Sequence, residues 1–91
     1  MSDTNYILVE DCCRYYSIET SFVRTLNEQG LLELEYTNES YFISHDQLSV
    51  LEKYMHLYYD LDINVEGLEA ISHLLRKVES LQDELKRLKN Q

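Results

Sequence analysis

Residues 17–32 read SIETSFVRTLNEQGLL, and this stretch decides the fold. It opens with Ser-Ile-Glu, which favours the start of a helix, and continues with apolar side chains at helical spacing, namely Phe22, Val23 and Leu26. Gly30 predicts the end of that helix, because glycine readily adopts the left-handed conformation found at helix ends. A helix that stops at Gly-Leu-Leu is typical of the second helix of a helix-turn-helix, followed by the start of a wing.

The segments on either side of this helix predict a mostly α-helical head with a small β-hairpin wing. An extended stretch and a first short helix precede it, and alternating apolar and acidic residues follow it before an aromatic, β-branched run. Turn residues separate the two strands of the wing. The expected ranges are 6–8 for the extended stretch, 9–16 and 20–29 for the helices, 32–36 and 41–43 for the strands, and 37–40 for the turn.

Two more helices are expected after the wing. Ser44 and Gln47 match a capping box, which predicts that a third helix begins there. Residues 60–64 break this helix, and a long fourth helix follows. The chain is therefore expected to divide into a winged helix-turn-helix head, residues 1–64, and a long C-terminal dimerisation helix, residues 65–91.

The break between the last two helices begins like a calcium-binding EF-hand loop, with Asp60, Asp62 and Asn64 at alternate positions. Val65 stands where such a loop needs glycine, and Ile71 stands where it needs a bidentate glutamate. We therefore interpret the segment as a helix break in which Asp62 or Asn64 caps the fourth helix, and we expect no metal there.

The fourth helix, expected at residues 65–89, carries apolar side chains at alternating spacings of three and four residues. They are Ile71, Leu74, Val78, Leu81, Leu85 and Leu88. Beyond Val78 nothing else in this short chain remains to cover the seam, and each leucine left exposed forgoes roughly 1.5–3 kcal/mol. We therefore expect a homodimer through this helix, and the alternative is a single helix that frays. The predicted dimerisation residues are Val78, Leu81, Leu85 and Leu88.

The 91 residues carry 8 basic and 17 acidic side chains, a net charge of −9. Residues 1–75 hold 3 basic against 14 acidic groups, a net charge of −11, whereas residues 76–91 carry +2. A DNA-binding protein normally presents clustered lysine and arginine, because counterion release from phosphates supplies much of its affinity. The predicted second helix and wing have Arg24 alone, so DNA is an unlikely ligand and a basic protein surface is the better match. The acidic residues around Arg24 are Glu19, Glu28, Glu33, Glu35 and Glu39.

No constellation in the sequence predicts an enzyme, a cofactor or a metal site. The vicinal Cys12 and Cys13 have no further ligand at metal-binding spacing, and one of them is expected to be buried. The three histidines stand far apart, without a nucleophile placed beside them. The N-terminus lacks the apolar core of a signal peptide, and no apolar run approaches the roughly 20 residues of a membrane span, so we expect a cytoplasmic protein.

The order of these elements resembles the MerR-type winged helix-turn-helix superfamily over essentially the whole chain. Within that superfamily, the chain is most similar to the short CbpM-like chaperone-modulator proteins. The likeness rests on four segments, which are DCC at 11–13, EQGLL at 28–32, YFIS at 41–44 and YYDLDINVEGL at 58–68. The chain departs from typical members in its tyrosine-rich helices and its lack of tryptophan.

The resemblance implies that the chain binds the J-domain of a J-protein cochaperone and inhibits its cooperation with the chaperone Hsp70. It also implies that the paired C-terminal helices run antiparallel. J-domains present a basic helix to Hsp70, so an acidic head would match that face, with exposed tyrosines as anchors. The head contains Tyr15, Tyr16, Tyr36, Tyr41, Tyr54, Tyr58 and Tyr59.

We predict that the partner-binding residues lie on the face formed by the second helix and the wing. They are Arg24, Glu28, Glu35, Tyr36 and Tyr41. For Arg24 a second interpretation stays open, in which it is solvated and pairs with Glu28 one turn along. The alternative function is a small MerR-like DNA-binding transcriptional regulator, and a third is a scaffold or antirepressor-like subunit for another basic protein.

Overall fold

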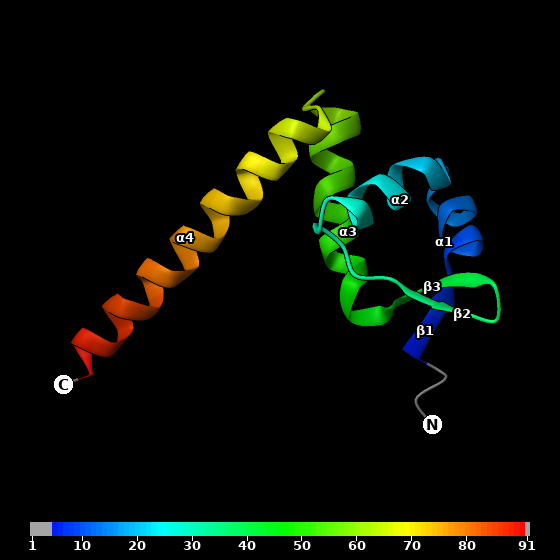
Figure 1. Ribbon diagram of the computed structural model, residues 1–91. Coiled ribbons are helices and arrows are strands. Elements are labelled where there is room, and N and C mark those ends of the chain that lie inside the picture. The colour runs from blue at the N-terminus through cyan, green and yellow to red at the C-terminus, as the bar shows by residue number, and fades with distance from the viewer. Residues whose placement is uncertain (1–4, 91) are drawn as a thin grey trace.

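The computed structural model describes residues 5–90, so the expectation about a signal peptide falls largely outside the described part of the chain. The head combines short helices with a small sheet at its edge, and one long helix leaves that head (Figure 1). This arrangement confirms the predicted fold class, mostly α with a winged helix-turn-helix head and a long C-terminal helix. The elements are β1 (Tyr6–Leu8), α1 (Val9–Tyr16), α2 (Thr20–Glu28), β2 (Glu35–Thr37), β3 (Ser40–Ser44), the 3-10 turn η2 (His45–Gln47), α3 (Leu48–Met55), the π turn η3 (His56–Asp60) and α4 (Val65–Lys89).

The two helices of the helix-turn-helix form because each buries an apolar stripe at helical spacing. A tight turn joins them, in which Ser17 has a left-handed backbone (φ 61) and the Ile18 amide donates to the Cys13 carbonyl at 3.0 Å. The buried side chains are Val9, Cys12 and Cys13 from α1, and Phe22, Val23 and Leu26 from α2.

The two leucines after α2 turn inward instead of starting a strand. Gly30 has a left-handed backbone (φ 77) that lets the chain reverse, and the Leu31 amide then donates to the Leu26 carbonyl at 2.9 Å. Leu31 and Leu32 are both buried, and the side-chain amide of Asn27 donates to the Leu32 carbonyl at 2.9 Å. The prediction that the first wing strand begins at residue 32 was therefore wrong, since β2 begins at Glu35. Burial of Leu31 and Leu32 outweighs the alternating pattern of apolar and acidic residues.

The wing belongs to a three-stranded antiparallel sheet in the order β1-β3-β2. β3 pairs with β1 in the register Ile7↔Ile43 and with β2 in the register Tyr36↔Tyr41. The turn Asn38–Glu39 has positive φ at both residues (51 and 62), which matches the twist of a tight hairpin. The hairpin is present as predicted, and the extended segment before α1 adds a third strand to it. The sequence did not predict this third strand, because its pairing partner lies far along the chain.

The predicted capping box at the start of the third helix was wrong. Ser44 has the extended backbone of an N-cap residue, but among the described residues its side chain makes no capping hydrogen bond. Gln47 Oε1 instead accepts a hydrogen bond from the Glu33 amide at 3.0 Å, which ties the segment before β2 to the start of the third helix. The 3-10 turn η2 therefore leads into α3.

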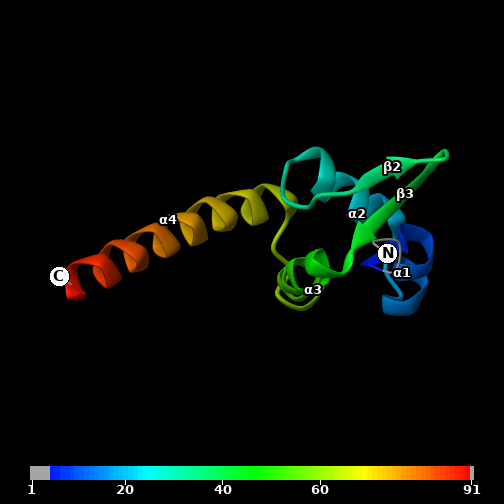
Figure 2. The ribbon, with the colours of Figure 1, turned by 90° about the horizontal axis from the view of Figure 1, so that it is seen from below.

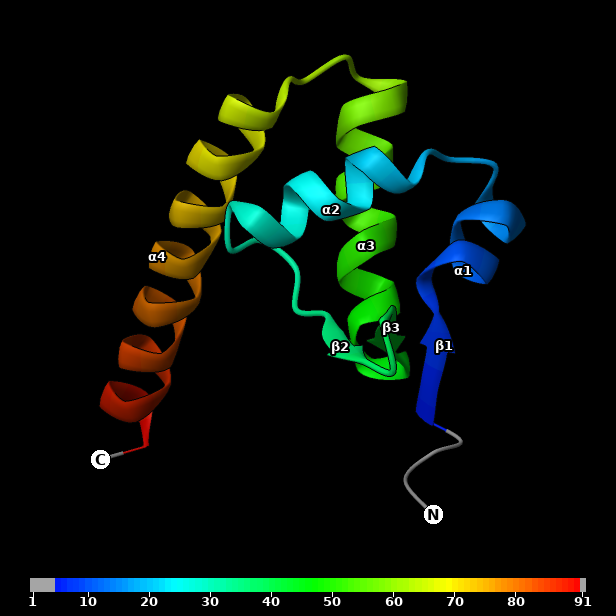
Figure 3. The ribbon, with the colours of Figure 1, turned by 45° about the vertical axis from the view of Figure 1, so that its right-hand side comes forward.

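The centre of the head is a core to which α2, β3, α3 and α4 each contribute one side chain without solvent exposure. These are Leu26, Ile43, Leu51 and Leu68, all 0% exposed. Through Leu68 and Ser72 the first turns of α4 belong to this core. Beyond them α4 extends away from the sheet and the other helices (Figure 2), and a short loop connects its first residue to η3 (Figure 3).

Asn64 begins α4 and is one of the two caps that the sequence predicts. Its Oδ1 accepts a hydrogen bond from the Gly67 amide at 2.8 Å. This bond satisfies an amide that the helix leaves free, and it stabilises the first turn of α4.

We expect Asn64→Ala to lower the free energy of unfolding by about 1 kcal/mol, because the cap is lost. Asn64→Asp keeps an acceptor oxygen at the same place, so we expect it to change the free energy of unfolding by only a few tenths of a kcal/mol. Urea unfolding followed by circular dichroism measures both. If both variants lose the same free energy of unfolding, the acceptor oxygen at position 64 does not stabilise the helix.

Candidate partner-binding surface

An arginine and two tyrosines join α2 to the wing. The guanidinium carbon of Arg24 lies 4.5 Å from the centre of the Tyr41 ring. The Tyr36 and Tyr41 rings are 4.7 Å apart at an angle of 50°, because the two residues are cross-strand partners on one face of the sheet. We call these three residues the Arg24 stack. A contact of this kind contributes roughly 0.5–1 kcal/mol at an exposed site.

The Arg24 stack lines a hollow of about 410 Å³ between α2 and the wing. Glu10 and Glu39 also line this hollow, so two carboxylates face one guanidinium. Tyr36 is 62% exposed, so its ring is open to a partner. The surface is therefore acidic and aromatic, with its single cation already in contact with a ring of the same chain.

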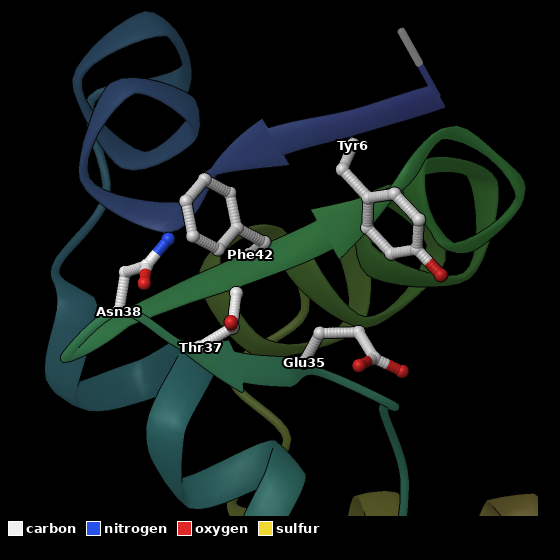
Figure 4. Close-up of a pocket in the computed structure, with 5 residues that line it drawn as sticks. All are labelled: Tyr6, Glu35, Thr37, Asn38 and Phe42. Carbon is white, nitrogen blue, oxygen red and sulfur yellow. The ribbon is translucent and has the colours of Figure 1, made fainter. Parts of the chain in front are cut away.

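The five predicted partner-binding residues do not share one face. Arg24, Tyr36 and Tyr41 come together as predicted, and the exposed Glu28 lies one turn along α2 from Arg24. Glu35 lies on the opposite face of the sheet, where it lines a hollow of about 440 Å³ with Tyr6 and Phe42 (Figure 4). The prediction that Glu35 shares a face with Tyr36 was wrong, because successive strand residues point to opposite faces and the sheet separates the two side chains.

The second interpretation of Arg24, an ion pair with Glu28, is not what forms. Within residues 5–90 the ion pairs are Asp11–Arg14 at 3.2 Å and His56–Asp60 at 2.8 Å, and Arg24 takes part in neither. The Tyr41 ring is its partner instead. The sequence could not predict this contact, because it depends on how the wing folds back over α2.

Apart from Tyr6 on β1, the other tyrosines of the head are one buried residue and two pairs. Tyr54 is buried in the core, so it is not among the exposed tyrosines that could serve as anchors. Tyr15 and Tyr16 make an edge contact at 5.1 Å, and Tyr58 and Tyr59 make one at 4.9 Å. The Tyr16 hydroxyl donates to Glu52 at 2.6 Å. That hydrogen bond, followed by burial, raises the pKa of Tyr16 to about 12.

The two cysteines are both buried, whereas the sequence predicted only one to be. Burial raises the pKa of the Cys12 thiol, and burial followed by the neighbouring Cys12 raises that of Cys13 to about 11. Such thiols are poor nucleophiles and poor metal ligands at neutral pH. Among the described residues, no group of three His, Cys, Asp or Glu side chains comes close enough together to hold a metal ion.

The outer part of α4 presents the predicted apolar seam to solvent. Its exposed fractions run from 46% at Val78 to 65% at Leu88. The exposed members are Leu74, Val78, Leu81, Leu85 and Leu88, and we call them the leucine seam. A continuous row of apolar side chains of this kind is typical of an interaction surface.

Two short helices joined by a tight turn, a wing beside them and a long C-terminal helix define a winged helix-turn-helix protein. Comparison with known families is more specific, since residues 7–90 match the family described as MerR HTH family regulatory protein. The chain therefore belongs to the MerR helix-turn-helix family and is a regulatory protein. No curated protein and no solved structure matched the chain. None of the described helices is long and apolar enough to cross a membrane.

The Tyr16–Glu52 hydrogen bond predicts a pH dependence. Because the pKa of Tyr16 is raised in the folded state, its stabilising effect is fully present below pH 10 and is lost as pH rises through about 12. Tyr16→Phe should therefore remove the highest step from the tyrosinate absorbance titration. Glu52→Gln should move that step downward, and an unmoved step in Glu52→Gln would contradict the assigned cause.

Proposed function

We propose that this MerR-family protein is a non-enzymatic regulator that binds the J-domain of a J-protein cochaperone and inhibits its cooperation with Hsp70. The observation that carries the proposal is the charge of the face that a winged helix-turn-helix protein offers to DNA. Residues 20–44, which span α2 and the wing, contain Arg24 against four glutamates. The likeness to CbpM-like modulators supplies the partner.

The same charge argues against the alternative of a DNA-binding transcriptional regulator. Affinity for a duplex rests on several lysine or arginine contacts to phosphate. The one candidate, Arg24, is 4.5 Å from the Tyr41 ring, and the carboxylates of Glu10 and Glu39 line the same hollow. DNA phosphates would be repelled here, so we expect random-sequence duplex to bind more weakly than the usual 10⁻⁴–10⁻⁶ M in a gel-shift titration.

A basic J-domain helix fits the acidic head for the opposite reason. Complementary charge accelerates encounter and sets register, while aromatic anchors supply most of the binding energy. Occupation of that J-domain helix would exclude Hsp70 from it, so inhibition would be competitive. This mechanism needs no catalytic group and no cofactor, and it places the protein in the cytoplasm with its partner.

We further propose that the protein acts as a homodimer through Val78, Leu81, Leu85 and Leu88. These side chains are exposed in a single chain, and burying each of them fully contributes roughly 1.5–3 kcal/mol. A second copy offers an identical seam, which suits the isologous pairing that most dimers use. An antiparallel pair, as the family likeness implies, would hold the two heads apart at opposite ends.

Charge reversal tests the partner. Glu28→Lys together with Glu35→Lys moves residues 1–75 from −11 to −7, and both positions are exposed, so folding should be unaffected. We expect association with a J-domain at low salt to slow by roughly tenfold, because electrostatic steering is weakened. Stopped-flow fluorescence with a labelled J-domain measures the rate, and circular dichroism checks the fold.

The matched control for this experiment is Glu79→Lys with Asp83→Lys, which makes the same charge change on exposed α4 residues beyond the head. It should slow association much less. A Glu28→Lys, Glu35→Lys variant that associates as fast as the wild type would contradict the proposed steering. Absence of J-domain binding by the wild type would overturn the proposed function.

The dimer has its own test. Leu85→Asp places an unpaired carboxylate in the leucine seam, which should cost several kcal/mol and give monomers in sedimentation experiments. Ser80→Asp adds the same charge on α4 outside the seam and should leave the dimer intact. A wild-type protein that is already monomeric at tens of micromolar would contradict the homodimer.

A further inference from the structure

The π turn η3 (His56–Asp60) creates an aromatic surface outside the Arg24 stack. It directs Tyr58 and Tyr59 toward the same side chain, Phe22 of α2. The ring centres lie 4.4 Å apart for Phe22–Tyr58 and 5.2 Å apart for Phe22–Tyr59. Phe22 is buried, whereas Tyr59 keeps 43% of its surface exposed, so the cluster anchors an aromatic ring at the surface.

Tyr59 is the point where three hollows meet. They measure about 240, 400 and 340 Å³, and Tyr59 lines all three. One hollow leads toward the start of α2, one toward Tyr16 and α3, and one toward the loop before α4. A side chain from a partner that reached this place would therefore meet an aromatic floor with open space around it.

The rim of these hollows is acidic. Carboxylates line each of them, and among the described residues neither lysine nor arginine lines any of the three. Two of the carboxylates are held in place, since Tyr16 donates to Glu52 at 2.6 Å and the ring nitrogen Nδ1 of His56 lies 2.8 Å from Asp60. A carboxylate has about four acceptor sites, so both keep free ones. The acidic residues of the rim are Glu19, Glu52, Asp60 and Asp62.

The Arg24 stack indicates which ligand suits such a surface. At the junction of α2 and the wing, the chain places a guanidinium of its own over Tyr41, next to lining carboxylates. Around Tyr59 the same combination of ring and carboxylates is present. Within residues 5–90, however, no lysine or arginine lies over the Tyr59 ring, and the cation–ring contact is that of Arg24 with Tyr41. A cation supplied by another molecule would complete the arrangement.

We propose that the surface around Tyr59 is the docking site for a basic segment of the protein partner. An arginine or lysine side chain lies over the Tyr59 ring and pairs with Glu52 and Asp60, and neighbouring basic residues of that segment face Glu19 and Asp62. Naming a J-domain helix as this segment rests on the proposed function. The site itself rests on the aromatic floor and on its charge, which repels nucleic acid phosphate.

The test distinguishes direct contacts at this site, which set the dissociation rate, from long-range charge, which sets the association rate. Glu52→Gln with Asp60→Asn removes two negative charges with little change of shape, and Tyr59→Leu removes the ring but keeps apolar packing on Phe22. We expect each to raise the dissociation rate from a J-domain by roughly tenfold, as loss of a direct charge pair or an aromatic anchor does. Unchanged circular dichroism shows that the variants are folded.

The matched control is Glu33→Gln with Asp46→Asn, which removes the same charge from exposed positions of the head that line neither the hollows around Tyr59 nor the hollow of the Arg24 stack. It should slow association but leave the dissociation rate within about twofold, because it acts through the field alone. The proposed site would be overturned if Glu52→Gln with Asp60→Asn and Tyr59→Leu both dissociate from the J-domain at the wild-type rate. The proposed function would still stand in that case, because the wild-type protein binds the J-domain.

If no J-domain binds the protein, an oligo-arginine peptide still tests whether the surface around Tyr59 binds a basic segment. Added to isotope-labelled protein, it should shift the amide resonances of residues around Tyr59 first. That result, without J-domain binding, would overturn the proposed function and support the site for another basic protein. Shifts spread evenly over all acidic residues, or centred on the wing, would overturn the site.

Discussion

The meeting of Leu26, Ile43, Leu51 and Leu68 is the contact on which the rest of this small protein depends. Each comes from a different element, and none is exposed to solvent. A head of this size buries little apolar surface, so it has no second core to fall back on. Because α2, β3, α3 and α4 share this one core, their relative positions are fixed together.

Two surfaces follow from that arrangement. Ile43 holds β3 in the core, and Tyr41, two residues earlier on the same face of β3, therefore lies beneath Arg24 of α2. Leu68 holds the start of α4, so the remainder of that helix must leave the head with its apolar side chains uncovered. In a regulatory protein with one acidic head and one apolar arm, the proposed partner binding and the proposed self-association would use separate surfaces.

The acidic charge does not suit the use that the shape of a winged helix-turn-helix suggests, which is binding to DNA phosphate. The shape presents a helix and a wing, but the single guanidinium there binds a tyrosine of the same chain. The remaining aromatic surface around Tyr59 is bordered by carboxylates. Both surfaces favour a basic protein over phosphate, because charge rather than fold decides which polymer approaches.

The sequence by itself determined the helices, the hairpin and the end points of α4, because these follow from local periodicity, turn residues and the Asn64 cap. It also determined the net charge, on which the proposed class of partner rests. Tertiary structure alone decided that β1 joins the sheet, that Leu31 and Leu32 turn inward, and that Gln47 binds the Glu33 amide instead of capping a helix. It also put Glu35 and Tyr36 on opposite sides of the wing and Arg24 over Tyr41. Such contacts join residues distant in sequence, and their energies depend on the shared core rather than on any local pattern.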